Sequence, residues 1–253
     1  MGLFDKKYCG VCGDKIGLFG NRKLTDANLC KNCAAKLSPW FSDRRSSTLE
    51  EIKAQLAYRE ENKQKVAAFH PTLTLGKNTK VLIDEDARRF LVTSERNWQN
   101  ANPDVIDIGD VTGCHIDVDE DRTELKQKDA EGKEIPYNPR RYEYEYDFYC
   151  EIAVNNPYFT EIRFRINSSS IHGESIAKPN GMILTPPISV EYRECQEIGE
   201  QIKKALMEGR SKVRAEAAKE AEPKKPVVCP FCGATTTPDA SGCCEYCGAP
   251  VNG

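Results

Sequence analysis

The sequence predicts an α+β protein in which a small, mostly antiparallel β-barrel is capped by a C-terminal helix and flanked by two four-cysteine modules. Three observations support this expectation. Eight of the 12 cysteines form four Cys-x-x-Cys pairs, two near each end of the chain. Between them, several short stretches alternate apolar and polar residues, as half-buried strands do. An amphipathic helical stretch follows these strands.

The cysteine pairs have the spacing of tetrahedral metal sites. A two-residue spacer turns both sulfurs toward one point, where zinc bonds to sulfur at about 2.3 Å. Seventeen residues separate the first two pairs, inside the usual window of about 15–20, and eleven separate the last two. The predicted ligands are Cys9, Cys12, Cys30 and Cys33 in the first site, and Cys229, Cys232, Cys244 and Cys247 in the second. We therefore predict two Zn²⁺ per chain, and both are expected to be structural because four thiolates leave no open coordination position.

Three other uses of these cysteines compete with zinc binding. Disulfides would need an oxidising compartment, and the N-terminus shows no secretory signal. A thioredoxin-like redox site would need one pair within a βαβ pattern, which does not surround either module. Four thiolates alone do not distinguish zinc from an iron–sulfur cluster, so that alternative stays open.

Three further cysteines fit the predicted core. Cys114 and Cys150 take inward positions of strand-like segments, and Cys195 lies on the apolar stripe of a helix. Free cysteine commonly packs as a small hydrophobic side chain, so we expect no chemical role for these three.

The adjacent cysteines Cys243 and Cys244 compete for one ligand position. Cys244 has the two-residue spacer to Cys247, and Gly248 then follows as Gly13 follows Cys12. A glycine takes the positive φ needed just past such a pair at little cost. We therefore predict that Cys244 is the ligand and that Cys243 points outward, open to oxidation.

Composition shifts divide the chain into five expected segments. They are a zinc finger over 1–46, a connecting helix over 47–70, a β-rich domain with its capping helix over 71–212, a charged linker over 213–226 and a zinc ribbon over 227–253. Ser47 and Glu50 predict a capping box for a helix that runs to about Ala67. Trp40 and Phe41 are expected to close the small core of the finger, with partner binding as the alternative.

The middle of the chain is rich in strand-like segments. Residues 80–84 and 89–93 flank an acidic turn and predict a β-hairpin. From Tyr142 to Val154, aromatic and aliphatic residues alternate with mostly charged ones, the pattern of a half-buried antiparallel strand. A long loop over 168–188 leads to a helix over 189–212. Short strands followed by one amphipathic helix suggest a barrel that the helix caps, an order that resembles a pleckstrin-homology-like domain.

Two segments resemble known families. The N-terminal one contains Cys9-Gly10-Val11-Cys12-Gly13, Gly17-Leu18-Phe19, Leu29-Cys30 and Leu37-Ser38-Pro39-Trp40-Phe41. It resembles an uncharacterised bacterial family whose first domain has unknown function and is treated as a zinc finger. The resemblance implies that a pleckstrin-homology-like barrel and a C-terminal ribbon follow. The segment Cys229-Pro230-Phe231-Cys232-Gly233-Ala234 with Cys244-Glu245-Tyr246-Cys247-Gly248 resembles the zinc ribbons of many bacterial proteins, in which a residue other than cysteine usually occupies the place of Cys243. Neither resemblance implies a substrate or a partner.

The net charge of −3 hides an asymmetry along the chain. Residues 1–46 hold nine Lys and Arg against four Asp and Glu, a surplus of five positive charges. Residues 70–188 hold 14 against 21, a surplus of seven negative charges. A four-thiolate zinc site adds a charge of about −2, so the basic surplus of the finger falls to about +3. That surplus is weaker than the footprint of a dedicated nucleic-acid-binding protein.

The chain is not expected to be an enzyme or to take a small-molecule substrate. Its three histidines, His70, His115 and His172, have no nucleophile or carboxylate at a motif spacing, and no glycine-rich phosphate loop is present. Residues 117–121 are acidic but lack the glycine and spacing of an EF-hand loop. No apolar run approaches the roughly 18–20 residues of a membrane helix, so a cytoplasmic location is expected.

Two binding functions remain. We favour an adaptor that binds a protein partner, on the basis of the closed metal sites, the acidic middle and the charged linker. The alternative is nucleic-acid binding by the basic finger, with Phe19 and Phe41 as further rings for stacking on bases. The residues for this alternative are Lys15, Arg22, Lys23, Trp40, Arg44 and Arg45.

Overall fold

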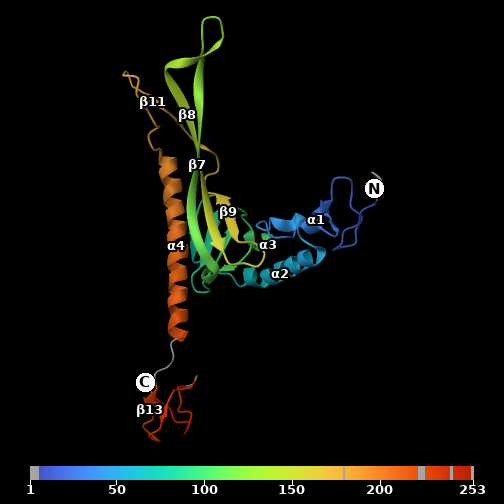
Figure 1. Cartoon of the computed structure of the whole chain (residues 1–253), viewed down its shortest axis with the longest axis vertical. Helices are drawn as coiled ribbons and strands as arrows, with labels where there is room; N and C mark the ends of the chain where they lie inside the picture. Colours follow the sequence, from blue (N-terminus) through green and yellow to red (C-terminus); the bar gives the residue numbers. More distant parts are fainter. Residues whose placement is uncertain (1–5, 179, 222–225, 240–241, 252–253) are drawn as a thin grey trace. The chain divides into compact units, whose positions relative to one another are not determined.

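The computed structural model of the chain describes residues 6–178, 180–221, 226–239 and 242–251. The chain divides into two compact units, residues 1–211 and residues 212–253, and each is described by itself (Figure 1).

The N-terminal module, residues 6–46, is built from very short elements. It contains β1 (Arg22–Lys23), β2 (Asn28–Leu29), α1 (Lys31–Ala34) and the 3-10 helix η1 (Asp43–Arg45). The strands β1 and β2 pair antiparallel. Its core holds Cys9 and Cys33 together with Ile16, Leu24, Leu29, Leu37 and Ile52. Because Ile52 lies on the next helix, the core of the module extends past residue 46 and includes part of the expected connector.

The helix α2 (Leu49–Ala67) begins one residue later than the expected cap implies. The N-cap is Thr48, whose hydroxyl accepts from the Glu51 backbone N–H while the Glu51 carboxylate accepts from the Thr48 backbone N–H. The capping box predicted at Ser47 and Glu50 is therefore wrong by one position. The Ser47 hydroxyl instead donates to the carbonyl of Asp43, the first residue of η1.

The β-rich region forms two antiparallel sheets. The first has the order β3 (Leu73–Leu75), β4 (Lys80–Asp84), β5 (Arg89–Thr93) and β6 (Ile106–Asp107). The second contains β7 (Val111–Lys128), β8 (Glu134–Val154), β9 (Glu161–Arg165) and β10 (Ile171–Glu174), with β7 on one edge of β8 and β9 and β10 on the other. The smaller elements are α3 (Trp98–Ala101), the 3-10 helix η2 (Ile108–Asp110), β11 (Ile176–Ala177) and β12 (Ile183–Leu184).

The clearest sequence patterns of the middle region are confirmed. The predicted hairpin over 80–84 and 89–93 is formed by β4 and β5, with Lys80 opposite Thr93. In β8 the side chains of Phe148, Cys150, Ile152 and Val154 are buried, while the residues between them are more accessible. The strands β7 and β8 are much longer than the expected segments, and they continue as a two-stranded ribbon beyond the body of the sheet (Figure 1).

The expected closed barrel is not formed. Among the described residues, the two sheets stay open and no strand pairing joins them. They nevertheless share one core, which includes Val81 and Phe90 of the first sheet and Phe148 and Ile162 of the second. Closure needs continuous pairing around the barrel, and β3 and β6 have only three and two residues to offer at the edges of the first sheet. The core is covered by a helix instead.

That helix is α4 (Val190–Ala221), which lies along the sheet of β7 and β8 (Figure 1). Cys195, Ile202 and Leu206 of α4 are buried in the shared core, as the apolar stripe predicted. A Cβ atom on Gly199 would lie 3.0 Å from Ile116 of β7, so glycine permits a close approach of the helix. The helix extends nine residues past the expected end at residue 212, because the following Ala, Glu and Lys residues favour helix. Of the expected linker, residues 222–225 lie outside the described part of the chain.

The C-terminal ribbon, residues 226–239 and 242–251, is smaller still. It has one antiparallel pair, β13 (Val227–Val228) and β14 (Thr235–Thr236). Its buried core consists of Cys229, Cys244 and Val251. Three buried residues exclude little apolar surface from water, so this unit needs another source of stability.

No helix in the described ranges combines the length and the apolar character needed to span a bilayer.

Candidate metal centres

The first pair of the N-terminal cluster lies in a tight loop, here called a knuckle. The Cys9 backbone N–H donates to the Asp14 carbonyl at 2.9 Å, and the Gly13 N–H donates to the Cys9 carbonyl at 2.8 Å. Gly13 has a φ of +77°, which glycine adopts without steric cost. The loop therefore folds Cys9 and Cys12 back toward each other, as the spacing predicted.

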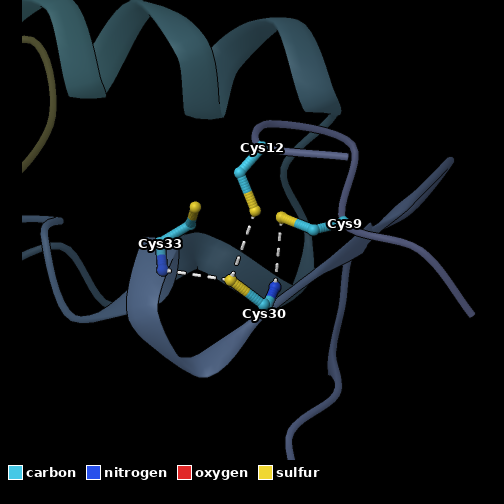
Figure 2. Close-up of side chains that lie close together, drawn as sticks. All are labelled: Cys9, Cys12, Cys30 and Cys33. Atoms are coloured by element: carbon cyan, nitrogen blue, oxygen red, sulfur yellow. Dashed lines mark hydrogen bonds between the residues drawn. The ribbon is translucent and has the colours of Figure 1, made fainter. Parts of the chain in front are cut away.

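The second pair of this cluster lies at the start of a helix. Cys30 is the N-cap of α1, and its sulfur accepts from the Cys33 backbone N–H at 3.3 Å. The Cys30 backbone N–H donates to the Cys9 sulfur, also at 3.3 Å, and this bond links the two pairs (Figure 2).

The four sulfurs lie close enough together to hold one metal ion. Figure 2 shows Cys9 and Cys12 facing Cys30 and Cys33, and the four ligand atoms lie within 4.8 Å of one another. The sulfurs of Cys12 and Cys30 are 3.8 Å apart. A regular tetrahedron with Zn–S bonds of about 2.3 Å has edges of about 3.8 Å. The residues therefore fit a zinc ion without rearrangement of this edge.

The pKa values of Cys9 and Cys33 are shifted in opposite directions. Burial by itself would raise the pKa of Cys9, but N–H groups of Cys12, Cys30 and Val11 donate to its sulfur and lower the pKa to about 6. Burial raises the pKa of Cys33, and hydrogen bonds with the neighbouring thiols raise it further. Thiolates packed this closely repel one another, and a central Zn²⁺ would offset two of their four negative charges.

The C-terminal cluster repeats the knuckle twice. The Cys229 N–H donates to the Ala234 carbonyl and the Cys244 N–H to the Ala249 carbonyl, at 2.9 and 2.8 Å. In each loop a glycine N–H returns to the carbonyl of the first cysteine, and these glycines, Gly233 and Gly248, have φ values of +74° and +70°. The two C-terminal loops and the loop of Cys9 are thus the same local structure.

The sulfur geometry of this cluster also fits zinc. The sulfur distances are 3.6 Å from Cys229 to Cys247 and 3.8 Å from Cys232 to Cys244, close to a tetrahedral edge. Burial would raise the pKa of Cys244, but N–H groups of Tyr246 and Cys247 lower it to about 6. Donation from the Cys232 N–H lowers the pKa of Cys229. Both clusters could therefore bind zinc.

The structure places Cys244 in the cluster and Cys243 outside it. Cys244 is buried, whereas Cys243 is partly exposed and forms an antiparallel bridge with Pro250. The Cys243 backbone N–H donates to the Asp239 carboxylate at 2.9 Å. This is the arrangement expected from the spacing and from Gly248.

A buried polar group connects the N-terminal module and α2 to the β-rich region. Asp104 accepts from the Ser38 hydroxyl at 2.8 Å and from the Arg59 guanidinium at 2.7 Å. Arg59 also donates to the carbonyls of Asn102 and Lys36. Burial raises the pKa of Asp104, against the opposing effects of Arg59 and Ser38. We call Ser38, Arg59 and Asp104 the buried bridge; sequence reasoning missed it because its members are far apart in the chain.

The residues of the nucleic-acid alternative do not all line one pocket. Arg22, Lys23, Arg44 and Arg45 line a single pocket of about 610 Å³, whereas Lys15 and Trp40 lie outside it. Trp40 packs against the core shared by the two sheets, and Phe41 packs against the core of the N-terminal module. The lid expected for the finger core is therefore Phe41, and Trp40 covers a different core.

A second polar cluster was not expected. His172 of β10 lies opposite Glu145 of β8, and its Nδ1 is 3.3 Å from Glu143 Oε1 and 3.7 Å from Glu145 Oε1. The three side chains lie close enough to share an ion. They are also well exposed, at 56%, 39% and 48% for His172, Glu143 and Glu145, so water can solvate them separately. Only the register of β10 on β8 brings them together, and no sequence spacing signals it.

Comparisons with known proteins concern the N-terminal module. A family model described as a domain of unknown function, DUF4428, matches residues 7–55. The match includes the four N-terminal cysteines and the first turns of α2, and it supports the resemblance of this segment to such a family. No curated protein and no solved structure matches the chain. The resemblance of the middle region to a pleckstrin-homology-like domain and that of the C-terminal segment to zinc ribbons remain predictions.

Proposed function

We propose that this chain is a zinc-binding, non-catalytic adaptor whose two zinc modules present surfaces to a protein partner. The observation that carries the proposal is the donor set of the two clusters. Each holds four cysteine sulfurs within 4.8 Å of one another. Zinc with four thiolates has no position for water or substrate, so the metal would hold the fold rather than take part in a reaction.

Exposed apolar side chains on both modules support binding to a protein. Leu18 and Phe19 of the N-terminal module are 85% and 88% exposed. Phe231 and Tyr246, each inside a C-terminal knuckle, are 70% and 72% exposed. Aromatic residues are enriched at protein interfaces relative to the rest of the surface. In this proposal each zinc ion stabilises the short loops of its module, and these loops then present the exposed side chains to the partner.

The metal assignment is tested by elemental analysis of protein purified without added metal. We expect two zinc ions per chain. Iron together with visible absorbance would instead indicate iron–sulfur clusters, and a single zinc ion would remove one of the two sites from the proposal.

The adaptor role is tested by affinity capture from the native cell with matched variants. We expect Phe231→Ser with Tyr246→Ser, or Leu18→Ser with Phe19→Ser, to lose a partner that the unmodified chain retains. Zinc counts must stay at two, which shows that the folds of the modules are intact. Capture that is equal in all three proteins would contradict a role for these surfaces.

Nucleic-acid binding is the weaker candidate. It requires rings for base stacking beside the cations. Trp40 and Phe41 are engaged in the two cores, and of the three rings considered Phe19 alone is left exposed. Fluorescence anisotropy with short DNA and RNA at several salt concentrations is the test. Binding that weakens steeply with salt would favour this candidate over the adaptor.

A further inference from the structure

One pocket of the N-terminal module is lined by an unusual set of side chains. Its lining residues are Asn21, Arg22, Lys23, Leu24, Thr25, Arg44 and Arg45. Four of the seven are cationic and none is acidic. The volume of about 610 Å³ is within the range of small-ligand sites.

The two walls of this pocket are fastened to each other. The Arg44 guanidinium donates to the Lys23 carbonyl at 3.1 Å, which joins η1 to β1. The backbone N–H and the hydroxyl of Thr25 both donate to the Ser47 carbonyl at 3.0 Å. The Arg22 guanidinium is held by the carbonyls of Phe19 and Asn21, at 3.3 and 3.2 Å. The positive charges are therefore kept near one another by the fold.

The residues that line the pocket supply no negative charge to these cations. Among the described residues, none of the four cations forms an ion pair with a carboxylate. The nearest acidic residues along the chain are used elsewhere: Asp26 accepts from the Leu49 N–H and Asp43 from the Ser42 hydroxyl. Burial lowers the pKa of Arg44, and the charges of Arg45 and Arg22 lower it further. The fold holds four positive charges close together although they repel one another. Such an arrangement indicates a site for an anion.

The side chains also indicate the kind of anion. A guanidinium presents paired N–H donors that match two oxygens of a phosphate group. No aromatic side chain lines the pocket, so it offers no platform on which bases of a single strand could stack. We propose that this pocket binds a compact phosphate-bearing anion, such as a triphosphate group. The inference does not depend on the adaptor proposal.

The test is isothermal titration of the full-length, zinc-loaded chain with inorganic triphosphate at low salt. We expect saturable binding of one triphosphate per chain. The test variant is Lys23→Gln with Arg45→Gln, because both side chains are exposed and neither makes a hydrogen bond within the described residues. Loss of two charged contacts is expected to weaken binding by at least about tenfold.

The matched control is Lys15→Gln with Lys31→Gln. These lysines are exposed on the same module, lie outside the pocket and remove the same charge. We expect the control to weaken binding by less than about twofold, since distant exposed charges are screened. An equal loss in both variants, or no saturable binding to the unmodified chain, would overturn the proposal. Zinc is counted after each titration, so that stripping of metal by triphosphate is not mistaken for binding.

Two further ligands identify the source of the phosphate. Adenosine triphosphate is expected to bind if the site accepts a nucleotide, and to fail if it takes only a free phosphate chain; either result supports the pocket. A single-stranded DNA of twelve nucleotides is the third ligand. Binding of this DNA through Lys23 and Arg45 without any binding of triphosphate would replace the proposal by a nucleic-acid site.

Discussion

The N-terminal cluster combines one knuckle with the start of a helix, whereas the C-terminal cluster combines two knuckles. The first is part of a core that includes Ile52 of α2, and the buried bridge joins it to the β-rich region. The second has a core of three residues, two of which are its own cysteines. The four cysteine pairs have identical spacing, but the two clusters they form lie in modules with cores of different size. In one the metal would add to an existing core, and in the other it would supply nearly all of the stability.

The largest expected difference follows from removing one ligand in each cluster. Structural zinc contributes about 10–16 kcal/mol of apparent binding free energy in finger peptides. We expect Cys229→Ser to lose one zinc ion and to unfold the C-terminal ribbon, with no change in the thermal unfolding of the first unit. We expect Cys9→Ser also to lose one zinc ion, but to lower the melting temperature of the first unit, because its core contains Cys9. Elemental analysis and circular dichroism measure both effects.

Removing zinc from the unmodified chain with a strong chelator also compares how much the two units depend on their metal. We expect the β signal to survive while both modules lose their metal, since the core shared by the two sheets contains none of the eight clustered cysteines. Loss of the β signal at the chelator concentration that removes zinc would show that the first unit depends on its metal as fully as the ribbon does.

Serine substitutions of the adjacent cysteines Cys243 and Cys244 test which of them is a zinc ligand. We expect Cys244→Ser to lose one of two zinc ions, because its sulfur is 3.8 Å from that of Cys232. Cys243→Ser is expected to keep both ions, because Cys243 lies outside the cluster. Zinc counting by elemental analysis distinguishes the two. The reverse result would assign the ligand to Cys243.

The buried bridge connects the N-terminal module to the β-rich region. Breaking it therefore tests how much this connection contributes to the stability of the first unit. Asp104→Ala leaves Arg59 buried without its partner, and such a loss costs about 3–5 kcal/mol. We expect a decrease of that size in the free energy of unfolding of the first unit in urea, with both zinc ions retained. The double variant Arg59→Met with Asp104→Leu is expected to be less destabilised than Asp104→Ala, because no charge is then left buried.

An exposed pair on the same helix serves as the control for this prediction. Lys63 lies 2.5 Å from Glu60 on α2, and both side chains are more than half exposed. Lys63→Ala should leave stability nearly unchanged, since solvent screens exposed pairs. If Asp104→Ala destabilises no more than Lys63→Ala does, the bridge is not what couples the module to the sheets.

The smallest effect is expected where the two clusters are alike. Gly13 and Gly248 both have positive φ, and a Cβ atom on either would meet nothing within 4 Å. Alanine there is expected to cost only the strain of the left-handed conformation, about 1–2 kcal/mol, and to weaken zinc binding by about tenfold in either module. Gly17→Ala is the control, because that site is equally open and its φ is not positive. Competition with a coloured chelator measures all three, and unequal effects of Gly13→Ala and Gly248→Ala would contradict a common knuckle.

Local patterns in the sequence were enough to predict several features. Spacing identified the eight clustered cysteines, because two residues between cysteines determine how their sulfurs converge. Spacing together with Gly248 favoured Cys244 over Cys243. Alternation over residues 142–154 correctly predicted the buried face of β8, because side chains of a strand point to opposite sides. The hairpin of β4 and β5 was predicted by its turn and its flanking apolar residues. All of these depend on residues that are close together in the chain.

Only the tertiary structure decided how distant segments meet. Three features depend on which residues tens of positions apart contact each other. They are the open edges of the two sheets, the packing of Trp40 on their shared core, and the buried bridge. The basic pocket likewise joins residues 21–25 to residues 44–45 through hydrogen bonds of η1 and β1. A short motif specifies the conformation of its own loop, because steric limits and backbone hydrogen bonds act over a few residues. The partners of that loop depend on which apolar faces bury each other, and this is a property of the whole chain.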